Sequence, residues 1–264
     1  MNKKGITPIG EQENGKIFGL STAERPGILF LFGRTHQGKS VTLAEIILSD
    51  IHNQRGGLFI DPWGDLIEDI LAHTPTAKAK KVKKFEATTG TFDENVKRFD
   101  KEIGFDQLQK DDQLFVLCKI AYKTLGEGVA REFGTYLTKQ FLKVIKEGNR
   151  TLGLDEAHNF LDDEAFKQIT QNKAKGLSVL LADQSSGHYQ KDIFEGLLKA
   201  SSHVLSFALD EDTAKLINKY HPEMKVSELM SLEKFHFMAK VNAKGTSPAV
   251  TKLRGIFPIP YPIN

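Results

Sequence analysis

Residues 33–40 combine glycine, lysine and a hydroxyl side chain at a spacing suited to holding a phosphate group. They fit the pattern G-x-x-x-x-G-K-[ST] (Walker A), in which consecutive backbone N–H groups converge on an anion. An apolar strand pattern precedes them, and the helix expected after them adds the positive end of its dipole. We expect Lys39 to reach the β- and γ-phosphates of a nucleotide and the Ser40 hydroxyl to ligate Mg²⁺.

The alternative for this segment is an ordinary strand–turn–helix connection with glycine in the turn. The strand and helix patterns on either side favour the phosphate loop instead. The residues expected to contact ATP are therefore Gly33, Arg34, Thr35, His36, Gln37, Gly38, Lys39, Ser40 and Val41.

An acidic pair, Asp155 and Glu156, ends a second short apolar strand pattern that starts at residue 151 (Walker B). A phosphate loop needs a carboxylate near its metal ion, so we expect Asp155 to lie beside Ser40 and to hold Mg²⁺. Glu156 would then orient or deprotonate the attacking water. An acidic helix start is the structural alternative, because Asp and Glu also stabilise helix N-termini. Together, the loop and the pair predict nucleotide hydrolysis.

Gln184 follows a nearly continuous apolar strand pattern at 177–182. Because the carboxyl ends of parallel strands line the ligand crevice of an open sheet, Gln184 is expected to reach the γ-phosphate or the attacking water. A turn residue before Ser185 is the alternative. The catalytic residues predicted from these motifs are Lys39, Glu156 and Gln184.

Strand and helix patterns alternate along the chain and must position these residues. The patterns predict strands near 27–32, 57–61, 82–86, 113–119, 151–155, 177–182, 203–209, 235–242 and 248–253, and helices near 39–52, 65–72, 128–147, 162–174, 190–199 and 211–219. This alternation favours an α/β fold with a mostly parallel sheet and helices on both faces. The last strands follow one another without a helix, which predicts an antiparallel C-terminal edge. We expect a single domain over 1–264, with room for a small insertion at 73–112 and an extended proline-rich arm at 256–264.

Composition excludes several classes of protein. Among 264 residues, 40% are hydrophobic and 27% charged, which excludes a collagen-like or largely disordered chain. A net charge of +2 does not by itself indicate nucleic acid. The single cysteine, Cys118, excludes an intrachain disulfide and a cysteine-based zinc site, and it is expected to be buried. With no apolar run long enough to span a bilayer and no signal peptide, a soluble cytoplasmic protein is expected.

Four strings together resemble the HerA/FtsK superfamily of hexameric DNA-pumping ATPases, in particular its HerA and conjugative coupling-protein (TraD/TraG-like) branches. The resemblance extends from about residue 28 to the C-terminal arm, and the string D-P-x-G-D-L is its most specific part. The strings lie at 33–40, 58–66 (Leu-Phe-Ile-Asp-Pro-Trp-Gly-Asp-Leu), 154–160 (Leu-Asp-Glu-Ala-His-Asn-Phe) and 182–184 (Ala-Asp-Gln).

The resemblance implies a RecA-like P-loop NTPase fold and a DNA translocase that hydrolyses ATP, with Mg²⁺, at the subunit interfaces of a homo-oligomeric ring, expected to be a hexamer. It implies nucleotide and Mg²⁺ binding for Lys39 and Ser40, hydrolysis for Asp155 and Glu156, and a sensor role for Gln184. Arg131 is the candidate for an arginine supplied across the interface, with Arg150 and Arg254 as competitors. The expected partners are DNA, bound through its backbone without sequence specificity, further copies of the chain, and a membrane or nuclease partner protein.

The chain departs from the family at His36, where family loops usually carry glycine. If the loop needs a positive φ there, a histidine is strained, which bears on nucleotide affinity. Family members also carry membrane helices, an all-helical domain or an N-terminal barrel that this sequence lacks, which suggests a minimal motor, a fragment, or a stripped-down branch such as packaging ATPases.

The expectation of DNA binding depends mainly on this resemblance. The lysine-rich run 78–84 and the segment 187–191 are candidate DNA contacts, and a solvated lysine-rich surface is the alternative for the first. The histidines are scattered without metal-ligand spacing and are interpreted as structural: His158, His188, His203, His221 and His236. Two other functions stay open: a secretion ATPase that moves protein, and a nucleotide-gated scaffold that hydrolyses ATP weakly.

Overall fold

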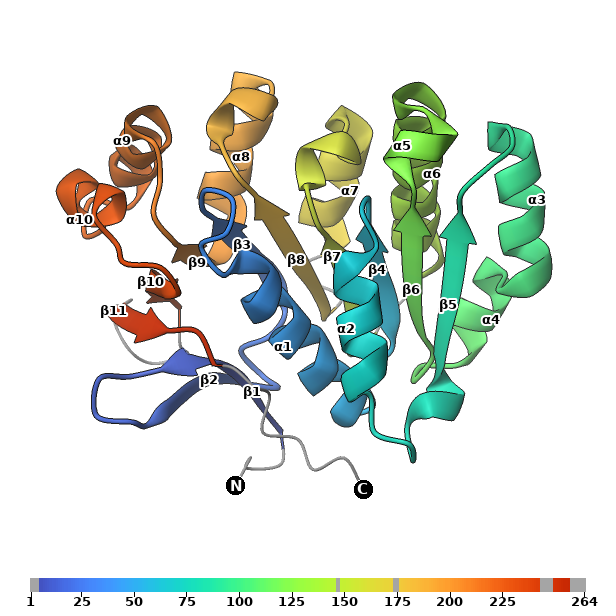
Figure 1. The fold of residues 1–264 in the computed structure, drawn as a ribbon, viewed down its shortest axis with the longest axis horizontal. Helices are drawn as coiled ribbons and strands as arrows, with labels where there is room; N and C mark the ends of the chain where they lie inside the picture. The colour runs from blue at the N-terminus through green and yellow to red at the C-terminus, as the bar shows by residue number, and fades with distance from the viewer. Residues whose placement is uncertain (1–4, 146–147, 173–175, 243–248, 257–264) are drawn as a thin grey trace.

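The fold is built on one large mixed sheet with helices on both faces (Figure 1). The computed structural model describes residues 5–145, 148–172, 176–242 and 249–256. Within them an 11-stranded sheet has the order β2-β1-β11-β10-β9-β3-β8-β7-β4-β6-β5. The seven strands from β9 to β5 are parallel, whereas β10, β11, β1 and β2 pair antiparallel. The proline-rich arm lies outside the described residues from 257 onward.

The strands of the sheet are β1 (Ile6–Glu11), β2 (Ile17–Ser21), β3 (Gly27–Phe32), β4 (Gly57–Asp61), β5 (Val82–Ala87), β6 (Phe115–Ile120), β7 (Arg150–Leu154), β8 (Leu177–Asp183), β9 (Ser201–Ser206), β10 (His236–Val241) and β11 (Ala249–Arg254). The α-helices are α1 (Lys39–His52), α2 (Asp65–His73), α3 (Phe92–Glu102), α4 (Phe105–Lys110), α5 (Tyr122–Leu125), α6 (Glu127–Val144), α7 (Asp163–Asn172), α8 (Lys191–Ala200), α9 (Glu211–Tyr220) and α10 (Val226–Met230). Short 3₁₀ turns include η1 (Ala79–Lys81), η2 (Ala157–Asn159) and η4 (Ser186–His188).

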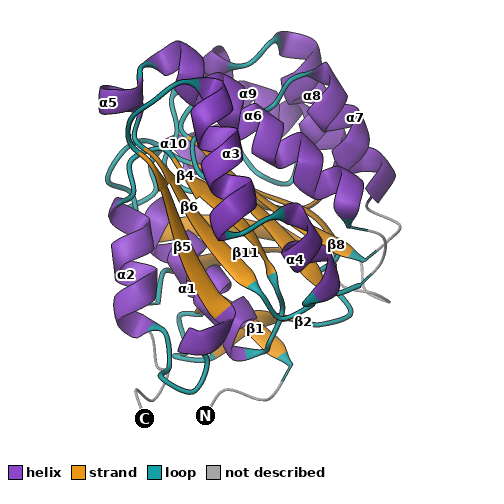
Figure 2. Cartoon of the chain, turned by 90° about the vertical axis from the view of Figure 1, so that its right-hand side faces the viewer, coloured by secondary structure: helices purple, strands orange, loops and turns teal. Residues whose placement is uncertain are grey.

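The sheet separates two apolar clusters, and β3 contributes to both because its side chains alternate between the faces. Phe30 and Phe32 pack toward α6, α7, α8 and α9, whereas Leu29 and Leu31 pack toward α1 and α2. Figure 2 shows these two helix layers on opposite sides of the strands. All six residues of β3 are buried. A strand covered on both faces has to be apolar throughout, which explains the continuous run 27–32.

The predicted strands and helices are confirmed, with boundaries that differ by a few residues. The antiparallel C-terminal edge is also confirmed, and it is longer than expected because β1 and β2 join it. The segment 73–112, for which a small insertion was allowed, contains β5, α3 and α4, and β5 forms the outer strand beside β6. No helix in the described residues is both long and apolar enough to cross a membrane.

A buried ionic network fixes α1 to the amino ends of the strands. Asp50, near the end of α1, accepts hydrogen bonds from Arg25 at 2.6 Å and from the Thr151 hydroxyl at 2.7 Å, and it lies 3.4 Å from Arg55. Ser178 of β8 connects both arginines, because it donates to the Arg25 carbonyl and accepts from Arg55. These contacts hold the end of α1 that is opposite the phosphate loop.

Candidate nucleotide site

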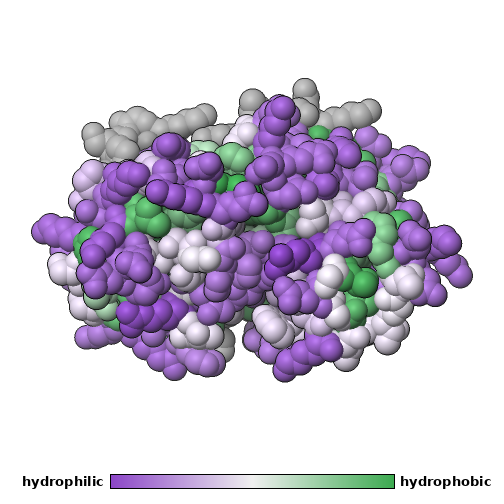
Figure 3. Space-filling model, turned by 90° about the horizontal axis from the view of Figure 1, so that it is seen from above, coloured by the Kyte–Doolittle hydropathy of each residue, from purple (hydrophilic) through white to green (hydrophobic). Residues whose placement is uncertain are grey.

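The three predicted motifs meet at one cleft of about 370 Å³ at the carboxyl ends of the strands. Strand β8 lies between β3 and β7, so the residues that follow these three strands are neighbours in space. The surface on this side, seen from above in Figure 3, is mostly hydrophilic with small apolar patches. The residues lining the cleft are Thr35, His36, Gly38, Lys39, Ser40, Val41, Trp63, Asp155, Glu156, Gln184, Lys234 and Phe235.

The loop backbone before α1 adopts left-handed conformations at two positions. His36 has φ 61° and Gly38 has φ 113°. The suspected conflict at His36 is therefore real: this position has the positive φ that glycine adopts at no steric cost. Gly33 is required for another reason, because a Cβ atom there would lie 2.5 Å from the Cβ of Phe207. The loop therefore depends on two glycines: Gly33 leaves room for Phe207, and Gly38 adopts a positive φ.

Lys39 lies at the base of the cleft and is largely buried. Its ammonium group donates to the Gly33 carbonyl at 2.6 Å and to the Arg34 carbonyl at 3.2 Å. Burial lowers its pKa, and the carboxylates of Glu156 and Asp155 partly oppose that effect. The ammonium therefore rests on the loop carbonyls, and the side chain also lines the cleft.

Asp155 and Glu156 line the same cleft as this loop, and both are largely buried. Asp155 is 8% exposed, and burial together with the neighbouring carboxylates of Asp61 and Glu156 raises its pKa to about 7. Asp61, at the end of β4, accepts from the backbone N–H groups of Trp63 and Leu66 and so caps the turn of the D-P-x-G-D-L string. Asp155 and Glu156, together with the Ser40 hydroxyl, offer the oxygen donors that Mg²⁺ prefers.

Gln184 connects the acidic pair with the phosphate loop. Its side-chain amide donates to Glu156 Oε1 at 2.5 Å, and its amide oxygen lies 3.4 Å from the Thr35 hydroxyl. Glu156 has φ 47°, an unusual value for a non-glycine residue, which turns its side chain toward Gln184. Gln184 therefore contacts both Glu156 and Thr35 of the loop, the arrangement that its predicted sensor role needs.

Two aromatic residues of the cleft were missed by the sequence analysis. Trp63 and Phe235 are 49% and 44% exposed, which is high for large apolar side chains. Phe235 precedes β10, has φ 66°, and donates its backbone N–H to the Gln37 carbonyl at 2.9 Å. Its ring lies beside Gly38, and the Lys234 ammonium is 4.9 Å from its centroid. Trp63 belongs to the D-P-x-G-D-L string but was not expected in the nucleotide cleft, and no local pattern marks Phe235, which only the sheet order brings to the loop.

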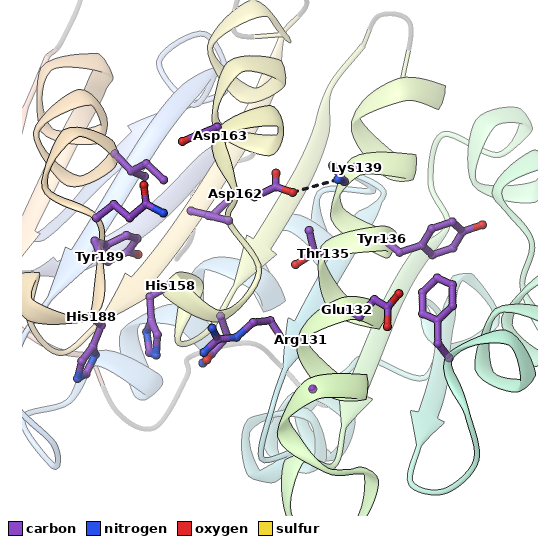
Figure 4. A pocket seen from close by; sticks show the side chains of 16 residues that line it. Arg131, Glu132, Thr135, Tyr136, Lys139, His158, Asp162, Asp163, His188 and Tyr189 are labelled. Atoms are coloured by element: carbon purple, nitrogen blue, oxygen red, sulfur yellow. Dashed lines mark hydrogen bonds and ion pairs between the residues drawn. The ribbon is translucent and has the colours of Figure 1, made fainter.

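Arg131 lies outside this cleft. It extends from α6 and lines a neighbouring cleft of about 710 Å³, together with His158, His188 and Lys139 (Figure 4). Its guanidinium contacts Glu127 at 3.1 Å, and half of the side chain is exposed. An arginine that acts on another subunit has to lie away from its own loop, so its role stays a prediction.

The two competing arginines differ in position. Arg150 is 4% exposed and donates to the Asp111 carbonyl at the amino end of β7, far from the phosphate loop. Arg254 ends β11 opposite His236 in the register, at the same edge as Phe235, and is exposed. Arg150 is therefore held in a structural contact, whereas Arg254 stays a competitor of Arg131.

No family model and no curated protein match this chain, whereas solved structures do. VirB4 of Thermoanaerobacter pseudethanolicus superposes with a TM-score of 0.68 at 12% identity, covering 97% of each chain. The bacterial conjugative coupling protein TrwB gives 0.66 at 11% identity, covering 96% of this chain and 89% of the other. The genome-packaging NTPase B204 of Sulfolobus turreted icosahedral virus 2, bound to ATP-γS, gives 0.59 at 14% identity, covering 88% and 98%. The chain therefore shares the fold of these three proteins.

The predicted resemblance and the RecA-like fold class are thereby confirmed. TM-scores of 0.59–0.68 establish the shared fold, and because the identities are only 11–14%, the roles of single residues in this chain are argued from its own cleft.

Proposed function

We propose that this chain is an Mg²⁺-dependent ATPase that moves DNA and works as a ring of identical subunits. The observation that carries the proposal is the convergence of the 33–40 loop, the Asp155–Glu156 pair and Gln184 on one cleft. Each motif occurs alone in many proteins, but a nucleotide site needs all three within reach of one triphosphate.

In the proposed reaction, the backbone N–H groups of the loop and Lys39 bind the phosphates, and Ser40 and Asp155 hold Mg²⁺. The metal ion neutralises charge on the phosphates when bound. Glu156 accepts a proton from the attacking water, which is held in place by Gln184. The hydrogen bond that Gln184 makes to Glu156 keeps this carboxylate turned toward the cleft.

Hydrolysis is proposed to depend on a neighbouring subunit, because the described residues place no arginine guanidinium among those lining the nucleotide cleft. An arginine across the interface would stabilise the charge on the transferred phosphoryl group. Arg131 is the first choice, since it is exposed at the mouth of the adjoining cleft.

DNA is proposed as the polymer because the structural neighbours TrwB and B204 are a conjugative coupling protein and a genome-packaging NTPase. Of the two candidate contacts, the segment 187–191 lies at the carboxyl side of the sheet and includes residues of the larger cleft. In the run 78–84, Lys81 and Lys84 pair with Asp111, Glu68 and Glu86, which favours a structural role for those lysines. We therefore assign the DNA contact to 187–191.

The test is the ATPase rate measured against protein concentration, with and without duplex DNA. We expect the rate per subunit to rise with concentration and to rise again with DNA. Glu156→Gln should reduce turnover by several orders of magnitude while retaining nucleotide binding, and Glu132→Gln on the exposed side of α6 serves as the matched control. Tight ATP binding with negligible hydrolysis at every concentration would instead indicate a scaffold, and turnover indifferent to DNA would favour transport of protein.

A further inference from the structure

Three side chains that the proposed nucleotide chemistry does not use, His158, Asp183 and His188, meet beside Glu156. His158 comes from η2, Asp183 ends β8, and His188 belongs to η4, so the adjacency of β7 and β8 brings them together. One ligand atom from each of these residues and from Glu156 lies within 4.8 Å of the others. Their spacing in the sequence gives no hint of this, which explains the prediction of structural histidines.

The distances within this cluster are those of ligands around a small metal ion. His158 Nδ1 is 2.9 Å from Asp183 Oδ2 and 3.8 Å from Glu156 Oε2, and His188 Nδ1 is 3.4 Å from Asp183 Oδ1. Ligand atoms of a tetrahedral zinc site lie about 3.3 Å apart, because Zn–N and Zn–O bonds are about 2.0–2.2 Å long. The contacts of 2.9–3.8 Å lie around this spacing, and the pairs that are further apart, up to 4.8 Å, have to close around a bound ion.

The donor set distinguishes this cluster from the Mg²⁺ site. Two imidazoles and two carboxylates suit Zn²⁺ and similar transition metals, whereas Mg²⁺ prefers oxygen ligands alone. With neutral imidazoles, Asp183 and Glu156 supply two negative charges, which balance a divalent cation. Asp183 is held in place by the backbone N–H groups of His158 and Gln184, so one ligand is already oriented by its own hydrogen bonds.

The cluster is also accessible. His158 and His188 line the 710 Å³ cleft, where they lie next to each other with ring centroids 4.4 Å apart (Figure 4). Glu156 lines the nucleotide cleft instead. The cluster therefore stands in the wall between the two clefts, and a cation can approach from the larger one without passing through the phosphate loop.

We propose that Glu156, His158, Asp183 and His188 bind a transition-metal cation such as Zn²⁺, and that this ion inhibits hydrolysis. Binding draws Glu156 Oε2 toward His158 and away from the attacking water. The proton on each Nδ1 moves to Nε2, which frees the nitrogen lone pair for the metal. The inhibition depends on the proposed ATPase function, whereas the binding site does not.

The first test measures binding on the nucleotide-free full chain, by calorimetric titration with ZnCl₂ and by the visible absorption of Co²⁺ in tetrahedral coordination. We expect one site that millimolar MgCl₂ does not displace. His188→Ala, at a position that is 44% exposed on the side chain, should fold normally and weaken binding about tenfold or more. His73→Ala, on α2, is the matched control. Equal affinity in His188→Ala and in the control would overturn the proposal.

The second test follows ATP turnover with Mg²⁺ in excess and free Zn²⁺ set by a metal buffer. Zn²⁺ should inhibit the wild-type protein and the His73→Ala variant, whereas the turnover of His188→Ala, measured without DNA and relative to its own rate without Zn²⁺, should lose most of the inhibition. Inhibition that persists in His188→Ala would place the effect on the nucleotide and overturn the inhibitory role. A protein that binds Zn²⁺ at this site but shows no turnover at all would count against the ATPase function alone.

Discussion

At the scale of single residues, helix α1 contains a buried acidic side chain, Glu45. Glu45 of α1 is 1% exposed, and neither of its carboxylate oxygens has a hydrogen-bond partner in the described part of the chain. Burial raises the pKa of Glu45 to about 7. A carboxyl group in this position is largely protonated below neutral pH and titrates around neutral pH, because ionisation leaves a charge without a partner.

This burial makes stability depend on pH. The folded pKa of Glu45 is raised above its ordinary value of 4.5. The stabilisation that the protonated carboxyl gives the folded state is therefore fully present below pH 4.5 and is lost as the pH rises through about 7. We expect Glu45→Gln to remove about 3 kcal/mol of the difference in unfolding free energy between pH 5 and pH 8. Urea unfolding at both pH values measures it, and exposed Glu132→Gln should leave the difference unchanged.

Phe235 provides a second prediction at the residue scale. Its ring is exposed at the mouth of the nucleotide cleft beside Gly38, where the base of a bound nucleotide can stack on it. Stacking of a base on an aromatic ring is worth about 1–3 kcal/mol, so Phe235→Ala should raise KM for ATP about tenfold and change kcat little. Steady-state kinetics would show it, with Phe235→Tyr as the control that keeps the ring. An unchanged KM in Phe235→Ala would exclude the contact.

At the scale of elements, the position of α1 depends on the network around Asp50. Asp50→Ala would leave the guanidinium groups of Arg25 and Arg55 buried without their carboxylate. Removing one partner of a buried ion pair costs about 3–5 kcal/mol, so we expect a loss of stability of that size. Chemical denaturation measures it against Asp69→Ala, an exposed acid on α2. A loss below about 1 kcal/mol would mean that water reaches the arginines.

Elements with a strong local pattern could be predicted from the sequence, and those defined by distant pairing could not. The strand at 27–32 is a continuous apolar run that begins at Gly27 and is followed by Gly33, the helix at 39–52 follows Gly38 with apolar residues at helical spacing, and both are found within those bounds. Strands β1 and β2 were missed because Pro8 and Gly10 interrupt the pattern, and because β1 depends on β11, from the other end of the chain.

The candidate site shows the same division. The phosphate loop, the acidic pair and Gln184 each end or follow a strand, and the rule that parallel strands present their carboxyl ends at one edge brings them together. Phe235 and the cluster around Asp183 depend on which strands are neighbours. Strand order is a property of the folded sheet, and no spacing in the sequence encodes it.

At the scale of the whole molecule, the trans role of Arg131 can be tested by mixing two inactive variants. Arg131→Ala lacks the proposed arginine, and Glu156→Gln lacks the base. In a mixed ring, an Arg131→Ala subunit retains its own Glu156 and can receive Arg131 from a Glu156→Gln neighbour. We therefore expect the mixture to hydrolyse ATP severalfold faster than either variant alone.

The control for this experiment is a mixture of Arg254→Ala with Glu156→Gln. Recovery in that mixture and not in the first would transfer the role to Arg254. If neither mixture hydrolyses ATP faster than its separate variants, neither Arg131 nor Arg254 of a neighbouring subunit is needed for hydrolysis.

The bond between the Phe235 N–H and the Gln37 carbonyl has a mechanical consequence. It ties the first residue before β10 to the stretch of backbone that would surround the triphosphate. If residues 33–40 rearrange when a phosphate is bound or released, either this hydrogen bond breaks or the antiparallel strands β10 and β11 move with the loop. The antiparallel edge of the sheet would thereby move with the phosphate loop during each proposed ATP turnover.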